Sequence, residues 1–392
     1  MTISQSRRKI LAGAAAGSAL LGAPAFIRNA GAANEFKIGM FYAIAGPAAA
    51  LFGPTQKACA ELAVEQINAK GGILGRRVQL LFANGDAAVA DATKAAVRMM
   101  LEDKVDFFLG SHNSAVREAL VATIKGKVPY VYTPIYEGGE CSSSTYVIAD
   151  TPQQQMETVL PWLHKQRAYK SVYLIGNDYV WPQVTNKHAK ANFSKLGVKV
   201  VGEEYVPLGA PNKFEEAVTR IKGAAPGMVL ITLVGGDNVN FNRTFAGFGL
   251  DKSILRVSSL LEENTLLGIG AESSKGLYGC MSYYSSVDTP AHRAFKSAYR
   301  KKYGEKAPIL GLIGVDTYAG VKFIEAVVGK AKGNSAAKVK AAADGITFPS
   351  ATGTMTMRHR HVDKDMYLAE CKGTEFHVVQ TFPGVPSGQS CS

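Results

Sequence analysis

Cysteine is scarce in this chain, and its spacing excludes a metal site. The 392 residues include five cysteines, which are too few and too scattered to scaffold a fold. At least one must stay unpaired within the chain, and Cys371 with Cys391 is a possible pair because both lie near the C-terminus. No two cysteines have the spacing of metal ligands. His359 and His361 are interpreted as surface histidines, since no acidic or sulfur ligand lies at a matching distance in the sequence.

Concentrated positive charge is also rare. Lys and Arg number 44 against 32 Asp and Glu, which gives a formal net charge of +12. Residues 1–33 hold four basic residues and no acidic one, which leaves about +8 (12 less 4) for the rest of the chain. The only dense basic runs are 300–302 and 358–361, and both fit a solvated surface. We therefore expect no nucleic-acid partner.

Motifs of common enzyme classes are missing. The sequence lacks a Gly-x-x-x-x-Gly-Lys-Ser/Thr phosphate loop, a Gly-x-Ser-x-Gly nucleophile elbow and a dinucleotide fingerprint. His112 has no evident nucleophile partner, and no cluster of metal ligands occurs. We expect a protein that is not an enzyme and that carries no cofactor.

The N-terminus has the pattern of an export signal. Arg7 and Arg8 precede an Ala/Gly/Leu-rich stretch that runs to about Ile27, and small residues up to Ala32 provide a cleavage site. The paired arginines match the twin-arginine type, with Ile10 where Phe is usual, and general secretion is the alternative route. No cysteine for a lipid anchor follows, and an uncleaved membrane anchor is the structural alternative. We expect cleavage near Ala32 and a periplasmic location.

Length and composition predict two lobes. With 392 residues, 47% of them hydrophobic, the chain exceeds what one hydrophobic core usually organises. From residue 36 onward, short apolar runs alternate with segments of helical periodicity. The first strands are expected at Phe36–Phe41, Val78–Ala83, Val105–Leu109 and Val128–Tyr132, with helices near 54–70 and 89–102. This alternation predicts a parallel, doubly wound α/β sheet that is covered on both faces.

A second sheet of the same kind is predicted beyond the loop at 138–144. Its strands are expected near 171–175, 198–206, 227–232 and 277–283, and its helices near 183–196, 212–223, 238–249 and 262–269. Two helices, near 289–303 and 311–332, and three short strands, near 353–357, 366–371 and 375–380, follow. The tail from Pro383 to Ser392 is rich in Pro, Gly and Ser and is expected to be loose.

The loops that follow the predicted strands are aromatic and rich in hydroxyl groups. In an open α/β sheet, ligands bind beyond the carboxyl ends of the strands, so these loops are candidates for a binding site. They contain Tyr42 and Phe52, the segments 110–114 and 133–138, and then 177–182, 234–238 and 262–263. Both predicted sheets therefore offer polar and aromatic groups at the same edge.

Several segments carry a family resemblance. The stretch 67–77, with Gly46-Pro47 before it, resembles the N-terminal lobe of the branched-chain amino acid receptors that serve ABC importers. The segments 136–138, 178–182 and 284–290 are similar to the urea and short-chain amide branch of that superfamily. The resemblance covers nearly all of the chain after the signal, and it implies a type I periplasmic binding protein fold: two doubly wound α/β lobes, joined by three hinge crossovers, that close on a small ligand.

The resemblance also implies domain boundaries. After a signal peptide at 1–33, the N-terminal lobe comprises 34–148 and 284–350, and the C-terminal lobe comprises 149–283 and 351–392. The crossovers are expected near 148–152, 282–286 and 348–353.

In the first lobe, the resemblance assigns ligand-binding roles around two strand ends. Ser114 matches the family serine that hydrogen-bonds a carboxylate or carbonyl oxygen of the ligand. Asn113 lies beside it where a helix begins, so free N–H groups there also favour an acceptor; the alternative is that Ser114 only caps this helix. The other candidates are Ile135, whose backbone carbonyl accepts from a ligand amide or amine, the adjacent Tyr136, and the family aromatic Phe52. Glu137 replaces the usual threonine, and it either contacts the ligand or serves the loop instead. Tyr132 is either a core residue or a cavity wall.

In the second lobe, Tyr179 matches the amide-branch tyrosine that covers the ligand. Trp181 either completes this aromatic wall or packs within the lobe. Asp237 and one of Glu262 and Glu263 are further candidates, which a ligand with a cationic amine would use and which urea or acetamide would not need.

These features predict a solute-binding receptor. It is expected to capture a small polar solute by lobe closure, as a monomer, and to deliver it to the membrane permease subunits of an ABC importer. A periplasmic sensor or chemoreceptor adaptor on the same fold is the alternative. The ligand stays open between urea, a short amide, a branched-chain or other amino acid, and an aromatic acid.

Overall fold

The structure is a computed structural model that describes residues 35–209 and 214–391. The predicted signal peptide at 1–33 lies outside the described residues, so its type and its cleavage near Ala32 stay predictions. Among the described residues, no helix combines the length and the apolar character that a membrane span needs.

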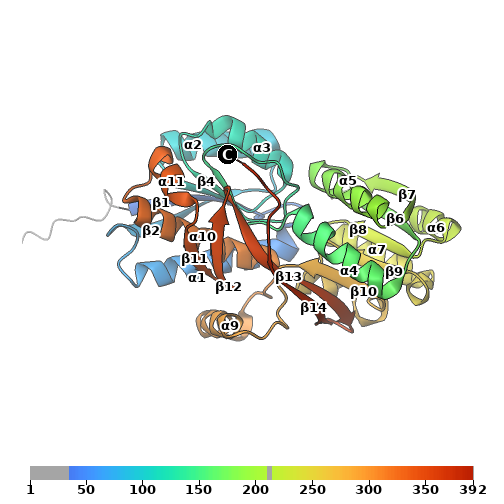
Figure 1. Cartoon of the computed structure of the whole chain (residues 1–392). Coiled ribbons are helices and arrows are strands. Elements are labelled where there is room, and N and C mark those ends of the chain that lie inside the picture. The colour runs from blue at the N-terminus through green and yellow to red at the C-terminus, as the bar shows by residue number, and fades with distance from the viewer. Residues whose placement is uncertain (1–34, 210–213, 392) are drawn as a thin grey trace, which may run out of the picture. The chain divides into compact units, whose positions relative to one another are not determined.

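The first sheet is parallel throughout, in the order β2-β1-β3-β4-β5 (Figure 1). Its strands are β1 (Glu35–Tyr42), β2 (Arg77–Asn84), β3 (Phe107–Gly110), β4 (Tyr130–Tyr132) and β5 (Thr145–Val147). The central strands β3 and β4 are buried along their whole length, which explains their unbroken apolar and aromatic sequences.

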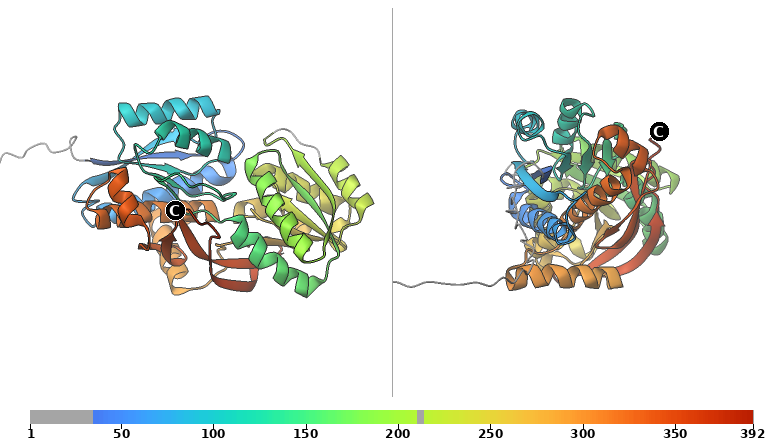
Figure 2. Two further views of the ribbon diagram at one scale, coloured as in Figure 1. Left: turned by 45° about the horizontal axis from the view of Figure 1, so that its top comes forward. Right: turned by 90° about the vertical axis from the view of Figure 1, so that its left-hand side faces the viewer.

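Helices cover both faces of this sheet (Figures 1 and 2). They are α1 (Ala49–Asn68) and α10 (Leu312–Ala331) on one face, and α2 (Val89–Leu101) and α3 (Ser114–Ile124) on the other. The helices α9 (Pro290–Tyr303) and α11 (Ala336–Ala343) pack against α1 and α10 respectively. Residues from 290 to 343 thus join the first lobe although they follow the second in sequence.

The second sheet combines a parallel part with an antiparallel part. Its parallel strands are β6 (Ser171–Asn177), β7 (Lys199–Val206), β8 (Met228–Thr232), β9 (Leu255–Ser258) and β10 (Leu277–Met281). Its antiparallel strands are β11 (Thr347–Ser350), β12 (Gly353–Arg358), β13 (His361–Lys372) and β14 (Glu375–Val385). The order is β11-β12-β13-β10-β9-β8-β6-β7, and β14 pairs with β13.

Helices also cover both faces of the second sheet. They are α4 (Thr158–Arg167) and α5 (Val180–Lys195) on one face, and α6 (Glu215–Ala224), α7 (Gly235–Gly247) and α8 (Glu263–Ile269) on the other. Short helical turns lie at Gln153–Glu157, Leu250–Lys252, Ala271–Ser273 and Gly304–Lys306. The two lobes confirm the predicted type I periplasmic binding protein fold, and the exact lobe boundaries stay predictions.

The C-terminal tail is not loose, and the suggested pairing of Cys371 with Cys391 is wrong. Cys391 forms a disulfide with Cys141 of the first lobe, whereas Cys371 is a free thiol buried within β13. Thr151 Oγ1 also donates to the carbonyl of Ser387 at 2.7 Å, so the tail is fixed along its length. The antiparallel course of β13 and β14 separates the two cysteines and directs the chain end back to the first lobe (Figure 1).

His361 is a second correction, because it is buried and does not lie on the surface. Its ring stacks on Tyr136 at a centroid distance of 5.6 Å, and burial lowers its pKa to about 4. The residue begins β13, where the strand crosses beside the first lobe, and its Nδ1 lies 3.0 Å from the carbonyl of His359.

Candidate functional site

A cavity of about 250 Å³ lies where the strand-end loops of the two lobes meet. This volume lies just below the usual range of small-molecule sites, about 300–1,000 Å³, and suits a small metabolite. The lining residues from the first lobe are Ala43, Pro47, Ala48, Phe52, Gln56, Gly85, Asp86, Ser111, His112, Asn113, Ser114, Tyr132, Pro134, Ile135 and Ile313. Those from the second lobe are Tyr179, Leu208, Gly209, Val234, Gly235, Gly236, Asp237, Asn240 and Leu260.

Six of the ten predicted binding residues line this cavity, namely Phe52, Asn113, Ser114, Ile135, Tyr179 and Asp237. The rule that ligands bind beyond strand ends therefore placed them together. Their contact with a ligand stays a prediction. Tyr132, left open between core and wall, also lines the cavity, and its hydroxyl donates to the carbonyl of His112 at 2.7 Å.

The first turn of α3 forms one wall. β3 ends at Gly110, and Asn113 caps the helix by accepting from the N–H of Val116 at 3.0 Å. Asn113 and the first helical residue, Ser114, both line the cavity. The N–H groups of the first helical turn add partial positive charge at this wall.

The charge of the cavity wall is acidic. Asp86 and Asp237 line it, and none of its described residues is Lys or Arg. His112 does not add a positive charge at neutral pH, because burial lowers its pKa to about 4. Asp86 accepts from the N–H of Ala48 at 2.9 Å, and Asp237 accepts from the Nδ2 of Asn177 at 2.7 Å.

Glu137 and Tyr136 are not among the residues that line the cavity, and their contact with a ligand stays a prediction. The carboxylate of Glu137 points behind the wall, where Oε2 accepts from Ser114 Oγ at 2.8 Å and Oε1 accepts from Arg117 Nη1 at 2.7 Å. Tyr136 is fully buried and packs on His361. Both side chains support the loop after β4, whereas the neighbouring Ile135 faces the cavity.

Trp181, left open between cavity wall and lobe packing, is buried within the second lobe and is not among the lining residues. Its ring lies 6.1 Å from the ring of Tyr179, which lines the cavity. Tyr179 comes just before the first residue of α5, and burial raises the pKa of its hydroxyl well above the ordinary value. The aromatic wall of the second lobe is therefore Tyr179 with Trp181 as its support.

Glu262 bonds to the first lobe and is not among the lining residues of the cavity, and its predicted ligand contact stays a prediction. Its Oε1 accepts from the N–H of Ile313 at 2.6 Å, in the first turn of α10. Its Oε2 is buried and has no hydrogen-bond partner among the described residues. Burial raises the pKa of Glu262 to about 8, although the hydrogen bond from Ile313 lowers it in part. Burial also raises the pKa of the adjacent Glu263, to about 7.

Glu262→Gln is expected to remove part of the pH dependence of stability. The folded-state pKa of about 8 exceeds the ordinary 4.5, so the native state binds the extra proton between these values. The stability contributed by the neutral form is complete below pH 4.5 and is lost as the pH rises through about 8. Gln fixes a neutral group, and the variant should be about 1–3 kcal/mol more stable than wild type at pH 9.

Unfolding by guanidinium chloride at pH 4.5, 7 and 9 measures this effect. Glu272→Gln is the matched control, because Glu272 lies in the same lobe with a side chain that is 93% exposed. Equal pH slopes for wild type and Glu262→Gln would contradict the raised pKa.

Several cavity residues had no assignment from sequence, among them Asp86, Gln56 and Ile313. Asp86 lies two residues beyond the end of β2, so the same strand-end rule would have included it. Gln56 lies on α1, and its amide is held by Ala43 and Ser111. Ile313 lies on α10, which is remote in sequence, and no local pattern brings it to the cavity.

A family model described as "Periplasmic binding protein" matches residues 35–375. The chain belongs to this family. The prediction that this protein is not an enzyme is thereby confirmed. The prediction of a solute-binding receptor is confirmed to the level of this family. The urea and amide branch is not supported by the match.

Relatives of this binding protein are distant. The Leu/Ile/Val-binding protein homolog 3 of Brucella melitensis is 26% identical over 347 residues, which cover 86% of this chain and 92% of the relative. A solute-binding protein of an ABC transporter from R. palustris, solved in complex with 4-hydroxybenzoate, is 22% identical with a TM-score of 0.81, covering 91% and 99% of the two chains. LivJ of Streptococcus pneumoniae, solved with isoleucine, is 20% identical with a TM-score of 0.78, covering 90% and 100%. The two structures show the shared fold.

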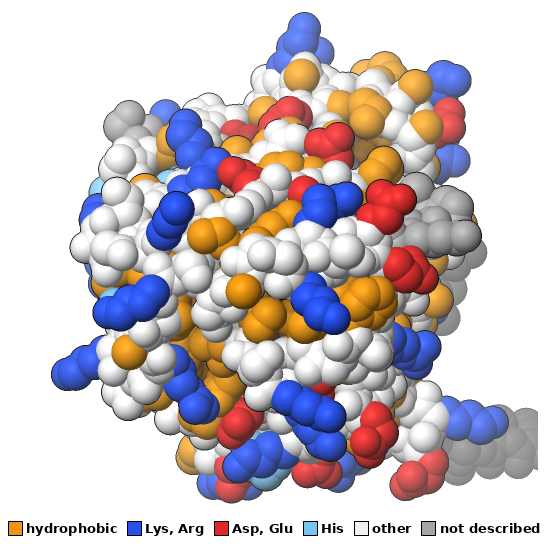
Figure 3. Space-filling model, turned by 90° about the vertical axis from the view of Figure 1, so that its right-hand side faces the viewer, with side chains coloured by type: hydrophobic (Ala, Val, Ile, Leu, Met, Phe, Trp, Pro, Cys, Tyr) orange, Lys and Arg blue, Asp and Glu red, His pale blue; other side chains and the backbone are white. Residues whose placement is uncertain are grey.

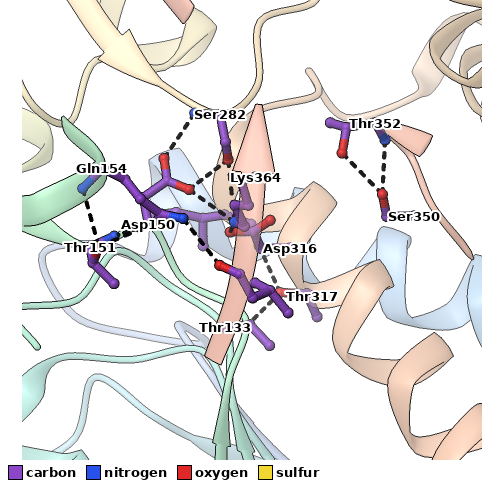
Figure 4. A network of polar contacts seen from close by, with 12 residues as sticks. Thr133, Asp150, Thr151, Gln154, Ser282, Asp316, Thr317, Ser350, Thr352 and Lys364 are labelled. Carbon is purple, nitrogen blue, oxygen red and sulfur yellow. Dashed lines mark hydrogen bonds and ion pairs between the residues drawn. The ribbon is translucent and has the colours of Figure 1, made fainter. Parts of the chain in front are cut away.

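A buried ion network occupies the hinge of the binding protein (Figure 4). Lys364 Nζ donates to Asp150 Oδ1 at 2.9 Å and to Asp316 Oδ2 at 2.7 Å. Asp150 also accepts from the backbone and the hydroxyl of Ser282, at 2.9 and 2.6 Å. Asp150 and Ser282 lie in two of the predicted crossovers, and Lys364 lies on β13, beyond the third. One lysine thus links three passages of the chain between the lobes.

The described surface of the binding protein has mixed charge where it is seen in Figure 3. On that face, Lys and Arg are interspersed with Asp and Glu. Ion pairs of the second lobe include Lys190 with Glu203 and Arg220 with Glu204, both at 2.6 Å. This mixture differs from the continuous basic surface that nucleic-acid binding needs. Within the described residues, no three His, Cys, Asp or Glu side chains gather as metal ligands.

Proposed function

We propose that this periplasmic binding protein is the extracytoplasmic receptor of an ABC importer. It captures a branched-chain amino acid, a short amide or urea between its lobes and delivers it to membrane permease subunits. The observation that carries the proposal is the cavity of about 250 Å³ whose walls come from both lobes. The names of the relatives, with their Leu/Ile/Val-binding and ABC transporter descriptions, support the same function.

The electrostatics of the cavity favour a ligand with an amine or amide group. Asp86 and Asp237 attract a cationic or N–H-bearing group. The helices α3, α5, α7 and α10 all begin at or next to lining residues, so their N-termini suit a carboxylate or carbonyl oxygen. An amino acid presents both kinds of group, and urea and amides present N–H and C=O together.

Lobe closure explains how binding is signalled to the permease. Contacts between the lobes frame the cavity: Asn264 Nδ2 donates to the carbonyl of Leu51 at 2.9 Å, and Glu262 accepts from Ile313. A hinge equilibrium that moves from 1:99 to 99:1 needs about 5.5 kcal/mol of differential affinity. A ligand that contacts both Ser114 and Tyr179 gains part of this energy only in the closed form.

Thermal-shift screening of the mature protein tests the proposal. A ligand among urea, acetamide and the branched-chain amino acids is expected to raise the melting temperature. At a ligand concentration of 100 Kd, the free energy of unfolding increases by about 2.7 kcal/mol. Tyr179→Ala should lower the affinity for the ligand by about tenfold or more, because the aromatic wall is lost. Phe248→Ala is the control, since Phe248 belongs to the same lobe but is exposed and outside the cavity lining. Equal losses in both variants, or chemical conversion of the ligand, would contradict the proposal.

A further inference from the structure

We infer that Ser114 acts as a hydrogen-bond acceptor toward the cavity, because Glu137, held by Arg117, takes the only proton of its hydroxyl. The cavity then selects ligands that present an N–H donor at this point. The inference rests on the proposed function and narrows its substrate class. It also reverses the direction of the hydrogen bond that the family resemblance implies for Ser114.

The first step is that the hydroxyl proton of Ser114 is used in the hydrogen bond to Glu137. Ser114 Oγ lies 2.8 Å from Glu137 Oε2, and both side chains are buried. A serine hydroxyl has one donor proton and two acceptor lone pairs, whereas an ionised carboxylate can only accept. Ser114 must therefore donate to Glu137, and only lone pairs remain for the cavity that Ser114 lines.

The second step is the anchoring of Glu137 as an ionised acceptor. Arg117 Nη1 bonds to its Oε1 at 2.7 Å, and the two side chains are 4% and 3% exposed. The guanidinium lies 5.4 Å from the ring centre of Tyr132 and 5.1 Å from that of Tyr136, so aromatic faces fix its plane. A charge-assisted bond of this kind is stronger than one between neutral groups. Arg117 thus acts as a positioning residue for Ser114 through Glu137.

The third step is the consequence for the ligand. A carboxylate oxygen placed against Ser114 would meet lone pairs and would leave two buried acceptors without a proton between them. An amide or ammonium N–H supplies the missing donor. Ser114 would therefore recognise the nitrogen end of an amino acid, amide or urea, and the oxygen end would lie elsewhere in the cavity.

Pairs of ligands in which only one member has an N–H group test this assignment. The pairs are acetamide with acetate, benzamide with benzoate, and L-leucine with 4-methylpentanoate, and the member without N–H is called the carboxylate member although L-leucine also has a carboxylate. Their affinities are measured by titration calorimetry for wild type, Glu137→Gln and Glu118→Gln. Glu118 is the matched control, because its carboxylate also contacts Arg117, at 3.4 Å, but its side chain is 55% exposed.

Wild type is expected to prefer the N–H member of each pair that binds. In Glu137→Gln, the Gln amide can donate to Ser114 Oγ and release the hydroxyl proton to the cavity. The preference should then move toward the carboxylate member by about tenfold or more, while Glu118→Gln keeps the wild-type preference. Equal preferences in Glu137→Gln and Glu118→Gln, with binding retained, would overturn the assignment and leave the proposed function intact.

Ser114→Ala gives a second test that does not depend on the folding of Glu137→Gln. If Ser114 accepts, this variant loses affinity for the N–H members about tenfold and binds the carboxylate members as well as wild type or better. If Ser114 donates, it loses affinity for the carboxylate members, and the assignment is wrong. A wild-type protein that binds none of the six compounds would refute the proposed function and this inference together.

Discussion

Lys364→Met is expected to destabilise the protein by about 3–5 kcal/mol. The lysine is 1% exposed and pairs with Asp150 and Asp316, which are also buried. Methionine has a similar length but no charge, so two carboxylates would remain in the hinge without a cation. Removing one partner of a buried pair costs far more than removing an exposed pair, because the remaining charge cannot be hydrated.

Unfolding of the purified variant by guanidinium chloride measures this loss. Lys372→Met is the matched control: it lies on the same strand, is 58% exposed and pairs with Glu370 at the surface, so its effect should stay below about 1 kcal/mol. Adding Asp316→Asn to Lys364→Met should recover part of the stability, since one unpaired charge is removed. Similar losses for the two lysine variants would show that the hinge network contributes little.

The parallel strands of the fold were predictable because buried strands leave unbroken apolar runs. The run Phe36–Phe41 became β1, and Val78–Ala83 became β2, each within a residue of its predicted ends. β5 and β9 were missed, since they have three and four residues and include polar or charged positions. Arg256 in β9 is buried and donates to Asn242 and to backbone carbonyls, a pairing that no local pattern reveals.

The candidate site was predictable only to the level of loops. The strand-end rule found the loops that hold Ser114, Ile135 and Tyr179, because it depends on topology alone. It did not separate Ile135 from Glu137, which lie two positions apart in one irregular loop and face different sides. Glu137 is bound by Arg117, which lies one turn along α3. A single sequence does not show that this helix lies behind the loop.

The disulfide was the clearest failure of reasoning from sequence distance. Cys141 and Cys391 are separated by 250 residues, yet the tail returns to the loop before β5. The Gly139 N–H donates to Oε1 of Gln389 in the tail at 2.8 Å. Nearness in sequence favoured Cys371, whereas the direction of β14 decides which cysteine the chain end meets.

Removal of this disulfide by the double change Cys141→Ser and Cys391→Ser is expected to cost about 2–5 kcal/mol. The bond closes a loop of most of the described chain, so its loss frees the unfolded ensemble and releases the tail from the first lobe. Dithiothreitol should lower the melting temperature of wild type to that of the variant and should leave the variant unchanged. The other three cysteines are buried free thiols, so the described residues offer the reductant no second disulfide. A wild-type protein insensitive to the reductant would contradict this role, whereas a sensitive one supports export to an oxidising compartment, where such a bond can form.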